Sequence, residues 1–211
     1  MDIFSPRFLS PVWFADILLR LPAVLWALSF HEFCHGWMAF KLGDRTAAYQ
    51  GRLSLNPMAH LDPIGTLMLI FFHFGWAKPV PINSRYFKNP RRDIALVSVA
   101  GAAGNFITAF VCGMLINLFH AISIQSPAIW TLVNYFLYMN IGLGVFNLIP
   151  IPPLDGSKIL AVMLPPAQMR TFFFLEQYGM IIILVLAATD ILPMIMEPII
   201  RVLGNLFLFK F

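Results

Sequence analysis

Residues 94–154 read IALVSVAGAAGNFITAFVCGMLINLFHAISIQSPAIWTLVNYFLYMNIGLGVFNLIPIPPL, and these 61 positions contain no Asp, Glu, Lys or Arg. Of all 211 residues, 59% are hydrophobic and 11% are charged, and the mean hydropathy is +0.78. Soluble domains carry about 25% charged residues, and a soluble core cannot absorb this much apolar surface. The composition therefore excludes a disordered chain, a coiled coil and almost any water-soluble globule. It predicts an all-α integral membrane helical bundle.

The apolar stretches divide into segments of the length that a bilayer requires, about 20 residues for each helical span. A first span is expected from Pro22 to about Leu42. The further predicted spans are 94–121, 129–149 and 172–195.

Three more apolar stretches leave the number of spans open. Residues 8–20 form an interfacial helix or the start of a long first span, and residues 196–211 either cross the membrane or lie at its surface. Residues 64–77 number only 14, which suits a re-entrant or tilted segment. The sequence thus predicts four to six spans in a single domain over 1–211 with its core at 22–165.

Basic residues indicate the orientation of the chain. Residues 78–93 hold five Lys or Arg, whereas the loop 122–128 holds none. The positive-inside rule then places 78–93 in the cytoplasm and 122–128 outside. The net charge of +4 reflects topology on this interpretation, and no nucleic-acid partner is expected. Residues 1–10 lack a small-residue cleavage site, so no removable signal peptide is expected.

Two short stretches alternate as β-strands do, RLSL at 52–55 and KPVPIN at 78–83. Pro79 and Pro81 cannot donate to a β-ladder, so the second stretch belongs at a sheet edge. We therefore predict a small membrane-associated β-hairpin or edge-strand element beside the helices.

The stretch His31-Glu32-Phe33-Cys34-His35 has the HExxH pattern. Histidines at i and i+4 lie on one helical face and can bind one metal ion, while the intervening Glu can act as a general base. These residues fall near the middle of a predicted span, where a carboxylate costs about 2.5–3.5 kcal/mol unless a cation offsets it. The alternative is that Glu32 and the histidines hydrogen-bond between helices.

A catalytic zinc ion takes three protein ligands and keeps one position open. Asp155 is the first carboxylate after the uncharged stretch and follows three prolines that break the helix. Non-helical backbone at membrane depth is tolerated only where it lines a cavity. Asp155 is thus a candidate third ligand, the alternative being an ordinary loop acid. Cys34 is either a soft extra ligand or a packing residue.

HEFCH at 31–35, followed by NLIPIPPLDG at 147–156, resembles the site-2 protease family of intramembrane zinc metalloproteases. Three intermediate segments match the family as well, namely GRLSLNPMAHLDPIGT at 51–66, GWAKPVPIN at 75–83 and AGAAGN at 100–105. The resemblance therefore covers about residues 25–165.

The resemblance implies that His31, His35 and Asp155 ligate one Zn²⁺ per chain and that Glu32 is the catalytic acid/base. It also implies a place near the reaction centre for Asn147, which we expect to donate a hydrogen bond to the oxyanion. The chain departs from the family's usual AGPxxN pattern, because Ala102 stands where that pattern has Pro. Asn105, the last residue of the pattern, is therefore not placed among the site residues.

We expect an intramembrane zinc endopeptidase that cuts single-span membrane proteins or peptides in or near their transmembrane segments. By resemblance, substrates would include membrane-tethered transcription factors, anti-sigma factors or leftover signal peptides. The short chain without accessory domains favours a prokaryotic inner membrane. An edge strand at 51–55 or 78–83 is expected to pair with the unwound substrate. The alternatives are a non-catalytic zinc-binding transporter or assembly factor, and a structural subunit without metal.

Overall fold

The computed structural model describes residues 10–72 and 75–209, and the predictions that fall on residues 1–9, 73–74 and 210–211 lie outside them. The longer helices are α1 (Pro11–Lys41), α4 (Pro90–Ala121), α5 (Pro127–Asn147) and α9 (Ile191–Phe207). The shorter α-helices are α2 (Thr46–Tyr49), α3 (Pro63–Phe72), α6 (Asp155–Met163), α7 (Pro166–Glu176) and α8 (Gly179–Ala188). Two 3₁₀ turns, η1 (Pro57–Ala59) and η2 (Ser84–Tyr86), complete the described elements.

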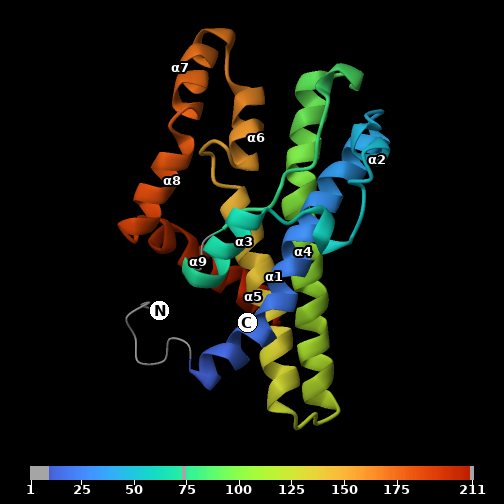
Figure 1. Cartoon of the computed structure of the whole chain (residues 1–211), viewed down its shortest axis with the longest axis vertical. Helices are drawn as coiled ribbons and strands as arrows, with labels where there is room; N and C mark the ends of the chain where they lie inside the picture. The colour runs from blue at the N-terminus through green and yellow to red at the C-terminus, as the bar shows by residue number, and fades with distance from the viewer. Residues whose placement is uncertain (1–9, 73–74, 210–211) are drawn as a thin grey trace.

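The helices α1, α4 and α5 pack against one another and form the core of the molecule (Figure 1). All three are long and apolar enough to cross a membrane. Between α4 and α5 the contact is made by small and branched side chains, with Ala109, Leu137 and Ile141 fully buried. A 32-residue helix is about 48 Å long, so α4 exceeds the hydrocarbon thickness of about 30 Å.

The first helix is longer than its predicted span, because α1 begins at Pro11 and continues through Pro22. Of the two alternatives for residues 8–20, the start of a long first span is therefore the one observed over the described part. The N-terminal end of α1 is capped by Ser10, whose hydroxyl oxygen accepts the backbone N–H of Trp13 at 3.3 Å.

The predicted span at 172–195 is not one straight helix. It is divided among α7, α8 and the beginning of α9, and the axes of α7 and α8 differ by 61°. Figure 1 shows α7 and α8 to one side of the three-helix core. The described chain thus has three candidate spans, or four if the bent pair crosses as one, and the upper estimate of six is not confirmed.

The predicted β-hairpin and edge strands are not confirmed, because the described residues contain no strand beyond one isolated antiparallel bridge between Leu61 and Ala77. Residues 51–55 form turns and bends, and residues 78–83 form neither helix nor strand. The physical reason is visible at Arg52. Its guanidinium group donates to the carbonyl oxygens of Lys78 and Pro79 at 2.7 and 3.1 Å, so these two carbonyl groups are not available to a neighbouring strand.

Candidate metal centre

The two histidines of HEFCH lie one turn apart on α1 and are both buried, with 4% and 6% of their surface exposed. The Nε2 atoms of His31 and His35 are 2.9 Å apart. Helix α4 reaches both rings at Gly101, where a Cβ atom would lie 2.5 Å from the ring of His35 and 2.7 Å from that of His31. Only a residue without a side chain lets α4 approach the imidazoles this closely.

Asp155 reaches the imidazoles from the first residue of α6. Its Oδ2 lies 3.1 Å from His31 Nε2 and 2.8 Å from His35 Nε2. The chain turns sharply between α5 and α6, and Gly156 makes this turn possible because a Cβ there would lie 2.2 Å from the carbonyl oxygen of Leu148. Residues 124 positions apart in the sequence thereby converge on one point.

These three side chains fit a zinc ion. Two imidazole nitrogens and one carboxylate oxygen are a donor set of catalytic zinc, and bonds of about 2.0–2.2 Å in a tetrahedron put the ligand atoms about 3.3 Å apart. The separations observed are 2.8–3.1 Å, so a small outward movement of the side chains admits the ion. A zinc ion held by these three ligands would keep a fourth position for a water molecule or a substrate.

The second ring nitrogen of each histidine faces an oxygen atom of α4. His31 Nδ1 lies 2.7 Å from Asn105 Oδ1, and His35 Nδ1 lies 2.7 Å from the carbonyl oxygen of Val97. Such acceptors hold the ring hydrogen on Nδ1 and leave the Nε2 lone pair for a metal. Sequence reasoning did not place Asn105 in the site, although an amide inside an uncharged membrane helix was a signal for it.

Glu32 lies beside the histidines and is half-buried. One ligand atom from each of His31, Glu32 and His35 lies within 4.8 Å of the others. The Oε2 atom of Glu32 accepts a hydrogen bond of 2.8 Å from the backbone N–H of Val80. The carboxylate is thus close enough to serve the same ion or its water, and a backbone group outside the HExxH motif holds it.

Lys158 binds the other oxygen of Asp155, with 2.9 Å between Nζ and Oδ1. Asp155 lies outside the three candidate spans. Burial on its own would raise the pKa of this carboxyl group, but the close contacts with His31 and His35 and the charge of Lys158 hold the pKa well below its ordinary value. These contacts favour the ionised carboxylate, the form that binds a metal.

Asn147 and Cys34, the other two residues named from the sequence, each make a contact of their own. The amide nitrogen of Asn147, at the end of α5, donates to the carbonyl oxygen of Leu143 at 3.0 Å, one turn back in the same helix. Cys34 packs its Sγ against Gly104, where a Cβ would lie only 2.4 Å away. Its position fits the packing alternative.

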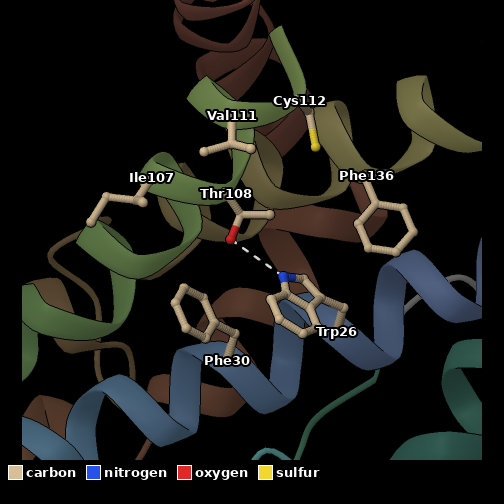
Figure 2. Close-up of a pocket in the computed structure, with 7 residues that line it drawn as sticks. All are labelled: Trp26, Phe30, Ile107, Thr108, Val111, Cys112 and Phe136. Atoms are coloured by element: carbon tan, nitrogen blue, oxygen red, sulfur yellow. Dashed lines mark hydrogen bonds between the residues drawn. The ribbon is translucent and has the colours of Figure 1, made fainter. Parts of the chain in front are cut away.

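A separate apolar hollow of about 370 Å³ opens between α1, α4 and α5 (Figure 2). It is lined by Trp26, Phe30, Ile107, Thr108, Val111, Cys112 and Phe136. The indole N–H of Trp26 donates to the Thr108 hydroxyl oxygen at 3.3 Å. No ligand candidate lines this hollow, so it is distinct from the metal centre.

Comparison with known proteins connects this geometry to a family. Residues 113–188 match peptidase family M50. Over 180 residues the chain is 40% identical to the Bacillus subtilis protein named "Putative zinc metalloprotease YwhC", covering 83% of this chain and 82% of that protein. It is 30% identical over 182 residues to Rip2 of Mycolicibacterium smegmatis, a protein with the same description, covering 83% and 68% of the two chains. No solved structure gives a significant match.

Proposed function

Because this chain belongs to peptidase family M50, we propose that it is an intramembrane zinc endopeptidase with its reaction centre at His31, His35 and Asp155. Three helices long and apolar enough to span a bilayer support the membrane setting. The observation that carries the proposal is the convergence of Asp155 Oδ2 with the Nε2 atoms of both histidines at 3.1 and 2.8 Å. HExxH alone provides two ligands, and the third comes from a distant helix.

His31, His35 and Asp155 would hold the ion, and Glu32 would act as the acid/base. Zinc bound there supplies Lewis-acid chemistry, because it polarises a peptide carbonyl and makes water more acidic. Glu32 accepts a proton from the attacking water and returns it to the leaving amine. Val80 holds Oε2 of Glu32, which leaves Oε1 to receive the proton.

Asn147 is proposed to stabilise the oxyanion that forms as water attacks the peptide. Its amide nitrogen carries two hydrogens, and the bond to Leu143 uses one of them. The second hydrogen can then be donated to the oxygen atom on which negative charge develops. Preorganised donors of this kind stabilise the transition state.

The segment 78–83 is the proposed guide for the substrate. Lys78 and Val80 each precede a proline, which favours an extended backbone at both positions. A substrate helix must unwind before its peptide bonds are accessible, and in lipid the released backbone groups need new partners. Strand pairing with those backbone groups of 78–83 that Glu32, Arg52 and the rest of the protein do not already use would provide them. The segment 51–55 is less suited, because it forms turns.

The proposed substrate is a single-span membrane protein or peptide that is cut in or near its membrane segment. We propose that the chain lies in a prokaryotic inner membrane. The five basic residues of 78–93 support a cytoplasmic position for that segment.

Purified protein provides the test. Wild type should contain one zinc per chain and cleave a model membrane-tethered substrate, and Glu32→Gln should keep the zinc and lose cleavage. Asp155→Ala should lose the metal. Zinc binding by a wild type that cleaves no substrate would favour a transporter or assembly factor, and a wild type without metal would overturn the proposal.

A further inference from the structure

Two fully buried amides connect α5 to the metal centre through α4. Asn105 and Asn140 are both 0% exposed. The amide nitrogen of Asn105 donates to the carbonyl oxygen of Ala27 at 3.0 Å and to Asn140 Oδ1 at 2.9 Å. Asn140 in turn donates to the carbonyl oxygen of Phe136 at 2.8 Å, and Asn105 Oδ1 lies 2.7 Å from His31 Nδ1.

The direction of each bond in this chain follows from chemistry alone. The carbonyl oxygens of Ala27 and Phe136 can only accept, so each amide must turn its nitrogen toward its carbonyl. The oxygen of Asn105 therefore faces His31, and His31 Nδ1 must be the donor. The lone pair of His31 is left on Nε2, the nitrogen that faces Asp155.

We propose that Asn140 is a positioning residue for the metal centre, acting through Asn105 on His31; this inference rests on the proposed function. Asn140 supplies the second acceptor for the amide nitrogen of Asn105. Without it, one N–H of an amide that is 0% exposed loses its partner, and an unsatisfied buried donor costs free energy. The side-chain amide of Asn105 can then rotate to find another partner. Such a rotation moves its oxygen away from His31 Nδ1 and so removes the acceptor that holds the His31 ring.

A purely structural role for Asn140 makes a different prediction. If the amide pair only joins α4 to α5, its loss lowers the stability of the metal-free and the zinc-bound protein equally. A positioning role instead reduces the affinity for zinc itself. Mutation of a residue that hydrogen-bonds to a metal ligand typically weakens metal binding by about 10- to 100-fold.

The experiment compares zinc affinities of the full chain in detergent, measured by competition with a chromophoric chelator. Asn140→Leu keeps the number of side-chain heavy atoms and removes the acceptor, whereas Asn140→Asp in its neutral form keeps an oxygen for Asn105 and a hydroxyl donor for the carbonyl oxygen of Phe136. The control is Asn134→Leu, because Asn134 lies on the same helix and makes an equivalent bond of 2.8 Å to the carbonyl oxygen of Trp130. If Asn140→Leu does not fold, Asn140→Ala takes its place.

We expect Asn140→Leu to weaken zinc binding about 10-fold, toward the lower end of that range because its effect is indirect. Asn140→Asp and Asn134→Leu should remain within about 3-fold of wild type by the same measure. The visible spectrum of the Co²⁺-loaded protein should change only in Asn140→Leu, as a report on ligand geometry.

A double-mutant cycle decides whether Asn140 acts through Asn105. In the Asn105→Leu background, Asn140→Leu should have no further effect on zinc affinity, whereas independent residues give additive losses. Additive losses, or unchanged affinity in Asn140→Leu, would overturn the inference while wild-type zinc binding and cleavage leave the proposed function standing. A wild type without zinc would overturn both.

Discussion

The backbone N–H of Val80 donates a hydrogen bond of 2.8 Å to Glu32 Oε2, across 48 positions of the sequence. This bond joins the segment 78–83 to the proposed acid/base. A hydrogen bond to a charged group contributes about 1.5–3 kcal/mol, which is enough to hold the carboxylate in one orientation beside His31 and His35. General-base catalysis depends on that placement before it depends on any pKa.

Replacing Val80 with proline removes this donor and suits an extended backbone. We expect cleavage to slow by about 10-fold or more, as the loss of a hydrogen bond to a charge implies, while the zinc content stays at the wild-type level. Val80→Ala is the matched control, because it keeps the N–H and removes the buried side chain that lies near Gly36. Equal rates for the two variants would show that the bond does not orient Glu32.

Adding one methyl group at Gly101 should disrupt the metal centre. A Cβ there would lie 2.5 Å from the His35 ring, so the rings or α4 must move, and overpacking of this kind costs about 1–3 kcal/mol. We expect Gly101→Ala to lower both the melting temperature and the zinc affinity. At Gly142 on α5, a Cβ meets no atom within 4 Å, so Gly142→Ala should be neutral or stabilising. Indistinguishable behaviour of the two alanine variants would contradict the packing of α4 on the imidazoles.

The segment 78–83 should also depend on Asp44, which is 1% exposed and accepts the backbone N–H of Asn83 at 2.6 Å. Asp44→Asn places an amide where acceptors are required, so we expect a loss of about 1–3 kcal/mol in stability and slower cleavage at unchanged zinc content. Glu197 pairs with Arg201 in an exposed ion pair, so Glu197→Gln should cost no more than about 1 kcal/mol. Chemical denaturation measures the stability of both variants. Equal losses of stability in Asp44→Asn and Glu197→Gln would contradict the prediction.

Removing the metal should destabilise the protein, since the ion binds only where folding brings Asp155 to the two histidines. At free zinc about 100 times the dissociation constant, the stabilisation is about 2.7 kcal/mol. Wild type and Glu32→Gln should therefore melt at a lower temperature after treatment with a chelator, whereas Asp155→Ala should not respond. A chelator effect of the same size in Asp155→Ala would place the metal elsewhere.

The helical spans were predictable because hydrocarbon selects them by composition alone. The spans expected at 94–121 and 129–149 correspond to α4 and α5, with ends that differ by at most four residues. At 172–195 the same reasoning missed the bend between α7 and α8. A mean composition contains no information on such a break. Beside it, a Cβ at Gly179 would lie 1.9 Å from the carbonyl oxygen of Pro152, a close contact that composition does not show.

The strand signals failed for a related reason. Apolar and polar residues alternate at 51–55 and 78–83, which indicates the face that a strand there would bury. A strand also needs a neighbouring segment whose backbone N–H and C=O groups are free to pair. Here Arg52 and Glu32 take up backbone groups of 78–83 with their side chains.

The amino-acid sequence by itself determined the membrane helices and the shared face of His31 and His35, because both follow from periodicity within one helix. Only the tertiary structure decided the rest of the site, namely the approach of Asp155, the amides of Asn105 and Asn140, and the bond from Val80 to Glu32. Contacts over 35 to 124 positions depend on the path of the whole chain, and the close packing at Gly101 and Gly156 that this path requires cannot be read from a local pattern.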